Sequence, residues 1–301
     1  MSEFRPGLSI TDLSGVGIDA LVECMLLCFQ DYFVPFGGDS SYWGPRFENS
    51  GVDYSLSMGV FGEDNMLIGF VVTAIQDSGD RGLQAYNAAT GVLPAYRGQH
   101  LVDHMYEFGI PLLKARGVSV CSLEVIVQNE VALKAYGRVG FRVTMTYLCY
   151  RGYLPSSEGR TSITEDPSMS TDLENPFRRF YSWDNRDVVL RNSPGEYVRY
   201  LVTEKATKQS VGFFVISPAT GNLSQFEIYN SAAIANASAC TVEGIESDRG
   251  RWVLLFDGIA QVSQAISIKN VSSERKILTD TLEFCCGMDN FVNQYEMSLV
   301  L

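Results

Sequence analysis

The sequence predicts an α/β (α+β) fold in two domains, each with a mixed central sheet flanked by helices. Helix and strand patterns alternate along the first half, an order that is typical of layered α/β structures. Both halves end in the order strand, short helix, glycine, strand, which indicates a divergent internal duplication. A chain of 301 residues is also longer than most single domains.

The first half contains strand patterns bounded by turn residues and helix patterns with apolar residues at helical spacing. The strands are predicted at residues 8–10, 58–61, 66–74, 84–92, 118–127 and 142–150. The helices are predicted at residues 21–29, 98–114 and 130–139, with Thr11 or Asp12 as the cap of the first. Residues 31–51 are rich in glycine, proline and aromatic residues, so we expect a loop or a broken helix there.

The second half follows a polar segment that is dense in serine, threonine, glycine and proline. This segment predicts a linker at residues 153–176 between domains at 1–152 and 177–301. Strands are predicted at residues 197–203, 211–216, 222–228, 252–256, 265–268 and 295–301. Helices are predicted at residues 232–245 and 273–286, the latter beginning at Ser273 and ending at Gly287.

Composition narrows the class of protein. An apolar fraction of 46% and a charged fraction of 19% are those of a globular protein, and no apolar run approaches the length of a membrane helix. Seven cysteines without a CxxC pair indicate neither a disulfide framework nor a zinc site, so we expect a soluble cytoplasmic protein. His100 and His104 are four residues apart, but no third ligand is evident, and no metal site is predicted.

The net charge of −12 bears on the partners of the protein. Phosphate backbones would repel such a chain, so a nucleic acid is not expected as a partner. A cationic acceptor such as an amine would be attracted to it.

The segment with the clearest chemistry is residues 92–102, here called the anion loop. A predicted strand ends at Val92, the chain turns at Pro94 and Gly98, and a predicted helix follows. Free backbone amides and the dipole at the start of a helix suit a pyrophosphate. Gly98 has no side chain and lets a ligand approach the backbone closely.

A second motif follows about thirty residues later, in residues 123–125 and 129–141. Together with the anion loop it resembles the GNAT superfamily of acyl-CoA-dependent N-acetyltransferases, over roughly residues 8–150. The resemblance implies that acetyl-CoA is the acyl donor. It also implies that the cofactor is bound by residues of the anion loop and of the second motif, namely Val92, Arg97, Gly98, Gln99, His100, Leu101, Val102 and Asn129.

The sequence departs from this family at two positions of the anion loop. His100 and Val102 stand where the family usually has small residues. Large side chains there could crowd the pyrophosphate, but they could also point away, and a protonated His100 could contact phosphate. The second half resembles a degenerate GNAT-type domain that lacks an Arg-Gly loop, so the cofactor is expected only in the first half.

The resemblance also implies catalytic roles. Tyr136 matches the general acid that protonates the departing thiolate, and its alternative role is a core aromatic. Val92 matches the residue whose N–H faces the thioester carbonyl. Asn129 could bind the pantetheine arm or cap a helix. Glu124 is the candidate general base, although the family often has a structural glutamate there.

The acceptor site is less well defined by the sequence. Tyr86 and Asn87 lie on the predicted central strand, where an acid–base or water-holding residue often sits in this family. Four aromatic residues lie where the family shapes its acceptor pocket, and they could line a cavity or form core: Tyr32, Phe33, Tyr42 and Trp43.

Two functions from different classes follow. The first is an N-acetyltransferase that moves an acetyl group from acetyl-CoA to a primary amine of a small molecule or peptide by direct attack. Its second half would support the acceptor pocket or form a homodimer interface. The alternative is a non-catalytic CoA-binding or protein-interaction module with the same fold.

Overall fold

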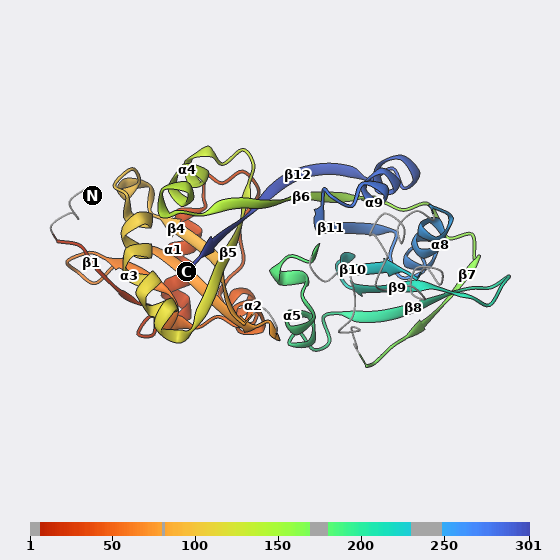
Figure 1. Cartoon of the computed structure of the whole chain (residues 1–301), viewed down its shortest axis with the longest axis horizontal. Coiled ribbons are helices and arrows are strands. Elements are labelled where there is room, and N and C mark those ends of the chain that lie inside the picture. Colours follow the sequence, from red (N-terminus) through yellow and green to blue (C-terminus); the bar gives the residue numbers. More distant parts are fainter. Residues whose placement is uncertain (1–6, 80–81, 169–179, 230–248) are drawn as a thin grey trace. The chain divides into compact units, whose positions relative to one another are not determined.

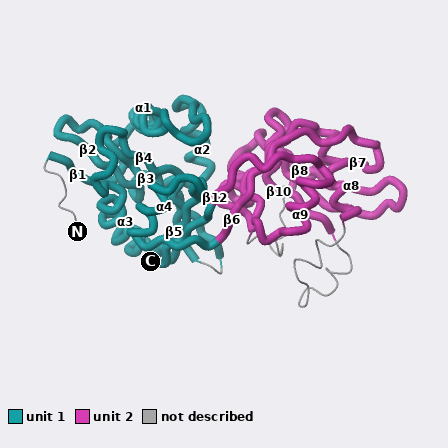
Figure 2. Tube along the Cα trace, turned by 90° about the horizontal axis from the view of Figure 1, so that it is seen from above, with its two compact units in different colours: residues 1–144, 295–301 teal, residues 145–294 magenta. Residues whose placement is uncertain are grey.

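The structure is a computed structural model that describes residues 7–79, 82–168, 180–229 and 249–301 (Figure 1). The chain forms two compact units (Figure 2), unit 1 with Met1–Thr144 and Tyr295–Leu301, and unit 2 with Met145–Gln294. The boundary therefore lies inside two strands, β6 (Arg142–Tyr153) and β12 (Asp289–Val300), and not in the predicted linker at residues 153–176. Each of these strands begins in one unit and ends in the other.

The sheet of unit 1 has the strand order β1-β2-β3-β4-β5-β12. Strands β1 to β4 are antiparallel neighbours, whereas β4 and β5 run parallel, so the sheet is mixed as predicted. Its elements agree with the predicted strands to within a few residues: β1 (Ser9–Asp12), β2 (Met58–Phe61), β3 (Leu67–Asp77), β4 (Leu83–Val92) and β5 (Val118–Ile126).

Helices cover both faces of this sheet (Figure 2). One side carries α1 (Ile18–Cys28) and α2 (Ser40–Ser50), and the other carries α3 (Leu101–Arg116) and α4 (Glu130–Val139). Strand β3 is buried on both faces: Ile68 belongs to the core under α3, and Phe70 to the core under α1. This explains its nearly continuous apolar sequence.

Helix α2 was not clearly predicted, because it lies in the segment expected to be a loop or a broken helix. Its start is fixed by Asp39, whose side chain accepts hydrogen bonds from two amides of the first turn, and its end by Gly51 with φ +82°. These caps hold a helix that contains Pro45. The predicted cap of α1 at Thr11 or Asp12 is wrong, since both residues lie in β1 and α1 begins after Gly17.

Unit 2 repeats the strand pattern of unit 1. Its sheet has the order β12-β6-β11-β10-β9-β8-β7, with β10 and β11 parallel and β7 to β10 antiparallel. The strands are β7 (Thr161–Glu165), β8 (Val198–Glu204), β9 (Ser210–Ser217), β10 (Asn222–Ile228) and β11 (Ala265–Ser272). Strand β7 lies inside the predicted linker, where a polar composition concealed a short edge strand.

The predicted strand at residues 252–256 is wrong, because these residues lie in α8 (Arg249–Ile259). The buried side chains Trp252, Phe256 and Ile259 have helical spacing, which a five-residue window is too short to distinguish from a strand. The predicted helix at residues 232–245 lies outside the described residues. The helix predicted at 273–286 exists as α9 (Lys276–Asp280) and the π-helical turn η6 (Thr281–Cys285). Its cap is Arg275 rather than Ser273, and Gly287 ends it with φ +64°.

Strand β12 supplies unit 1 with its last strand, next to β5 (Figure 1). Met297 of β12 is only 4% exposed and belongs to the core under α3 and α4. The Leu301 amide donates a hydrogen bond to the Ser119 carbonyl at 3.0 Å, and the Thr144 hydroxyl donates one to Glu296 Oε1 at 2.9 Å. The first unit therefore depends on the last residues of the chain.

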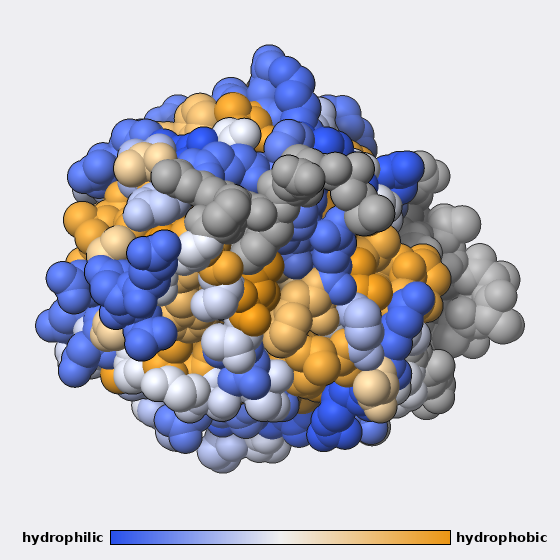
Figure 3. Space-filling model, turned by 90° about the vertical axis from the view of Figure 1, so that its left-hand side faces the viewer, coloured by the Kyte–Doolittle hydropathy of each residue, from blue (hydrophilic) through white to orange (hydrophobic). Residues whose placement is uncertain are grey.

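Some apolar side chains of unit 1 reach the surface. On the face shown in Figure 3, apolar residues gather in the centre and hydrophilic residues surround them. At least a third of each of the following side chains is exposed: Leu26, Leu27, Phe33, Tyr42, Met66, Val131 and Val143. Within the described parts of the chain, no helix combines the length and the apolar character needed to cross a membrane.

The role of β12 can be tested with Met297→Ala. Removing this buried side chain should lower the free energy of unfolding by about 2–4 kcal/mol through lost burial and an unfilled cavity. Val300→Ala is the matched control on the same strand, because Val300 is 80% exposed, and it should cost less than about 0.5 kcal/mol. Urea denaturation measures both. Equal effects would contradict a role for β12 in the core of unit 1.

Candidate functional site

Strands β4 and β5 part in the middle of the sheet of unit 1. Their described pairing ends at Asn87 and Leu123, although β4 continues to Val92 and β5 to Ile126. Strand β4 also has a bulge at Ala88, because Ala89 faces Val72 whereas Asn87 faces Thr73. A bulge bends its strand and commonly ends a pairing. The parting leaves room for a ligand at the end of β4.

A cleft of about 610 Å³ opens where these strands part. Its wall brings together all the residues predicted to bind the cofactor and one of the two predicted catalytic residues. These are Val92, Arg97, Gly98, Gln99, His100, Leu101, Val102, Asn129 and Tyr136. Residues far apart in the sequence thus converge on one cavity within unit 1.

The anion loop forms one side of the cleft. After β4 the chain makes the short helix η3 (Pro94–Tyr96), and α3 begins at Leu101. The N–H groups of the first turn of a helix have no acceptor within the helix, and the dipole adds partial positive charge there. Gly98 has φ +76°, and a Cβ added to it would meet no atom within 4 Å. The loop therefore offers amides and open space to an anion.

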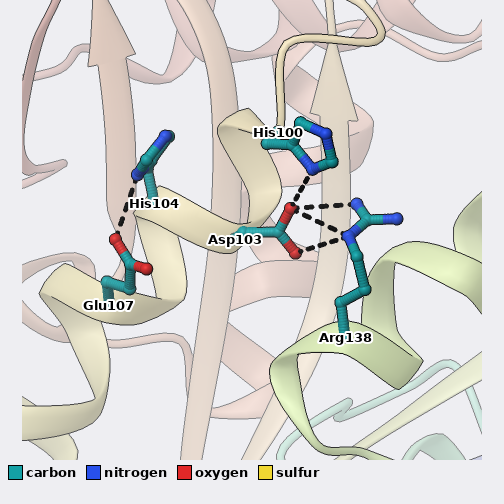
Figure 4. Close-up of polar contacts among 5 residues, drawn as sticks. All are labelled: His100, Asp103, His104, Glu107 and Arg138. Atoms are coloured by element: carbon teal, nitrogen blue, oxygen red, sulfur yellow. Dashed lines mark hydrogen bonds and ion pairs between the residues drawn. The ribbon is translucent and has the colours of Figure 1, made fainter. Parts of the chain in front are cut away.

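His100 has a backbone that normally favours glycine. Its φ is +57°, in the left-handed region, which costs a residue with a side chain about 1 kcal/mol. Its Nδ1 lies 2.8 Å from Asp103 Oδ2, and Arg138 Nη2 donates to the same oxygen at 2.9 Å (Figure 4). The imidazole is thus turned toward Asp103, and the cleft is open with His100 and Val102 in its wall.

The two histidines do not converge on a common point. His104 Nδ1 pairs with Glu107 Oε2 at 3.0 Å, so each histidine has its own acidic partner three residues later (Figure 4). Both histidines border a second cavity of about 410 Å³ along α3, together with Asp103, Glu107 and Arg138.

Arg97 is engaged with the protein itself. Its Nη1 and Nη2 donate to the two carboxylate oxygens of Asp31 at 2.6 and 2.9 Å. Nη2 also donates to the Cys28 carbonyl at 2.8 Å, and Nε to the Val92 carbonyl at 3.3 Å. The Arg97 guanidinium holds the pKa of Asp31 below its usual value. The side chain of Arg97 therefore meets protein acceptors where sequence reasoning expected a cofactor.

Tyr136 lies in the wall of the cleft and is only 8% exposed. Burial raises the pKa of Tyr136 to about 12, and hydrogen bonds with Thr90 and Asn87 offset part of this shift. Thr90 Oγ1 donates to Asn87 Oδ1 at 2.9 Å, and Asn87 Nδ2 donates to Tyr106 at 2.9 Å. Tyr136 is therefore a buried core aromatic that also borders the cleft, and its role as the general acid stays a prediction.

Glu124 lies apart from this group. Its Oε2 accepts a hydrogen bond of 2.6 Å from the Tyr86 hydroxyl, from β4 to β5 next to the point where their pairing ends. Among the residues that the structure describes, those that line the cleft do not include Glu124. Asn129 caps α4, because its Oδ1 accepts a hydrogen bond from the Ala132 amide at 3.1 Å. This confirms the helix-capping role that was one of its two predicted roles.

The aromatic residues after α1 take both of their expected roles. Tyr32 and Phe33 line the cleft, and Phe33 is 56% exposed. Trp43 packs away from it, stacked on Phe36 with ring centres 5.0 Å apart. Burial raises the pKa of Tyr32, and a hydrogen bond with Asn129 partly offsets that shift.

Sequence reasoning missed several residues at this site. Asp103 follows His100 by three residues on a helix, a spacing that places the two side chains on one face and could have revealed the pair. Asp31 and Arg138 carry no local signal, because their partners lie on other elements. Thr90 pairs with Asn87, three residues earlier on β4.

Comparison with known proteins shows what this part of the chain is similar to. Residues 23–141 match the sequence model described as "Acetyltransferase (GNAT) family". A stretch of 59 residues, 20% of this chain, is 34% identical to N-alpha-acetyltransferase 30 of Schizosaccharomyces pombe. This stretch covers 39% of the length of that protein.

Solved structures resemble the whole chain. The crystal structure of a GCN5-related N-acetyltransferase from Sphaerobacter thermophilus has a TM-score of 0.61 at 11% identity, covering 99% of this chain and 97% of that one. A tandem GNAT protein from the clavulanic acid biosynthesis pathway has a TM-score of 0.58 at 11% identity, covering 97% and 98%. The chain therefore has the fold of two GNAT-like domains, as predicted.

The protonation of Tyr136 can be tested by ultraviolet titration of tyrosinate. Because the pKa of Tyr136 is raised to about 12, Tyr136→Phe should leave the absorbance unchanged up to pH ~11 and remove one group that titrates above it. The stability contributed by the neutral phenol is present below pH ~10 and is lost as the pH rises toward 12. Loss of absorbance near pH ~10 in the variant would contradict the raised pKa.

Proposed function

We propose that this protein, whose residues 23–141 match the model of the acetyltransferase (GNAT) family, transfers an acetyl group from acetyl-CoA to a primary amine. The acceptor is an amine of a small molecule or peptide, which attacks the thioester directly. The observation that carries the proposal is the convergence of the anion loop, Asn129 and Tyr136 on one cleft of about 610 Å³.

The donor is held by backbone groups in this proposal. The amides of residues 98–102 receive the diphosphate at the start of α3, where helix dipole and free N–H groups favour an anion. Gly98 supports this role, because its missing side chain leaves the backbone open. Asn129 and the start of α4 stand on the other side of the same cleft and contact the pantetheine arm.

The thioester carbonyl is polarised by the backbone at the end of β4. β4 stays paired with β3 up to Val92, but β5 has parted from it beyond Asn87, so the other edge of β4 near Val92 is open to the cleft. An N–H aimed at a developing oxyanion in a pocket with little water stabilises the transition state.

Tyr136 assists the departing thiolate. A buried phenol with a pKa of about 12 is protonated throughout the physiological range, so it can donate a hydrogen bond to the sulfur. Complete transfer to a thiolate of ordinary pKa near ~8.5 would be uphill by about 5 kcal/mol. Tyr136 therefore stabilises the growing negative charge, and the ammonium formed by the attack supplies the proton.

The amine must be neutral when it attacks. Glu124 is the proposed base, and the short hydrogen bond from Tyr86 offers a connection from Glu124 to the central strand. Because Glu124 stands outside the wall of the cleft, its action on the amine requires a water between them.

The alternative is a module that binds CoA or a protein without catalysis. The feature that favours it is the left-handed backbone of His100, which keeps a side chain at a position suited to glycine. A protein that binds acetyl-CoA but transfers no acetyl group to any amine would support this alternative.

Donor binding can be tested with a matched pair of glycine variants and calorimetric titration of acetyl-CoA. Gly98→Ala and Gly117→Ala both place a methyl group on a left-handed backbone, φ +76° and +90°, in open space at opposite ends of α3. Each should lower stability by about 1 kcal/mol. Gly98→Ala alone should weaken acetyl-CoA binding by about tenfold, because its methyl group occupies the approach to the amides. Equal affinities in the two variants would contradict donor binding at the anion loop.

Catalysis can be tested with Tyr136→Phe in a screen of amine acceptors. Removing the hydroxyl should lower kcat by about 100-fold while acetyl-CoA affinity stays within about twofold, since the hydrogen bond is needed only in the transition state. Tyr42→Phe, a half-exposed ring outside the cleft, is the control and should leave kcat unchanged. Unchanged turnover in Tyr136→Phe would remove this residue from the mechanism.

A further inference from the structure

The segment between α1 and α2 has little structure of its own. Residues 30–38 take part in no helix or strand, so side-chain contacts fix their position. Residues 29–36, here called the aromatic segment, contain four aromatic residues: Phe29, Tyr32, Phe33 and Phe36. Three of them, Phe29, Tyr32 and Phe33, stand in the wall of the cleft.

The aromatic segment is joined to the anion loop by Arg97. Both oxygens of Asp31 accept from the Arg97 guanidinium, a bidentate arrangement that fixes orientation as well as distance. The same side chain donates to the Cys28 carbonyl, at the end of α1, and to the Val92 carbonyl, at the end of β4. One guanidinium thus connects three segments around the cleft.

The aromatic segment is also joined to the start of α4, which lines the same cleft. Tyr32 hydrogen-bonds with Asn129, which caps α4. Its ring contacts Phe29 and Phe33 edge to face, with ring centres 5.1 and 5.6 Å apart. Two contacts therefore hold Tyr32 and Phe33 in position: the ion pair of Asp31 with Arg97 and the hydrogen bond of Tyr32 with Asn129.

We propose that Arg97 is a positioning residue rather than a cofactor ligand. It holds the aromatic segment over the cleft through Asp31, so that Tyr32 and Phe33 form the acceptor side of the site. This inference rests on the proposed function, because only a transferase has an acceptor to position. The bridge is solvent-accessible, with side-chain exposures of 40% for Arg97 and 58% for Asp31, so its contribution is to placement more than to stability.

Trp43 reports on the segment without any acceptor. It is stacked on Phe36, and its Nε1 donates to the Gly37 carbonyl at 3.0 Å, so release of the segment should expose it. The other two tryptophans, Trp183 and Trp252, are 1% and 0% exposed and belong to unit 2. Subtracting the fluorescence of Trp43→Phe from that of the other proteins isolates this signal.

The test compares Asp31→Asn, Arg97→Ala and the double variant in the full-length chain. Each single variant should raise the acrylamide quenching of Trp43 about twofold and leave the Kd for acetyl-CoA within about twofold. The double variant should show no more quenching than either single variant, because both substitutions break the same bridge. Once an amine acceptor is known, its KM should rise about tenfold in each single variant, with little change in kcat. Arg97→Lys keeps the charge and should restore part of the quenching protection.

Other results would overturn the inference. If Arg97→Ala weakens acetyl-CoA binding tenfold while Asp31→Asn does not, Arg97 is a direct ligand of the donor. If neither variant changes the quenching of Trp43, the bridge does not position the segment. If the wild-type chain fails to bind acetyl-CoA, the proposed function fails, but the quenching still shows whether the bridge holds the segment.

Discussion

The site depends on one feature of the sheet, the parting of β4 and β5 beyond Asn87 and Leu123. A closed parallel pair would place β5 backbone against residues 88–92 and leave no cavity there. The bulge at Ala88 bends β4 at the point where the pairing ends, and hydrogen bonds from Thr90 to Asn87 and from Asn87 to Tyr106 satisfy polar groups there. The cleft, the exposed backbone near Val92 and the position of Tyr136 all follow from this parting.

The electrostatics of the cleft are arranged around paired charges. Arg97 is neutralised by Asp31, and Arg138 shares Asp103 with His100. The positive character available to an anion therefore comes mainly from backbone amides and the dipole of α3, which no change of side chain removes. This is consistent with an open cleft in a chain that has His100 and Val102 at positions where the family usually has small residues.

Sequence reasoning predicted the parts of the fold that local patterns determine. The strands β2, β4 and β5 and the helix α4 were predicted to within a residue or so, because apolar periodicity and glycines mark their ends. The anion-loop residues that were predicted to bind the cofactor all line one cleft, and their role in cofactor binding stays a prediction. By contrast, α8 was predicted as a strand, since its short apolar run fits both periods. The bridge between Arg97 and Asp31 joins residues 66 positions apart, and no local pattern encodes such a pair.

The place of β12 in unit 1 has a consequence for how the protein forms. Strand β12 completes a sheet whose other strands lie within the first 126 residues. After β5, the ribosome must therefore synthesise about half of the whole chain before β12 can cover the edge of that sheet. Until then β5 presents unpaired backbone groups, which can pair with other chains. Contacts of such long sequence separation slow folding. The first unit is synthesised early but its sheet is completed late, and the intermediate in which the edge of β5 is still unpaired is the one prone to aggregation.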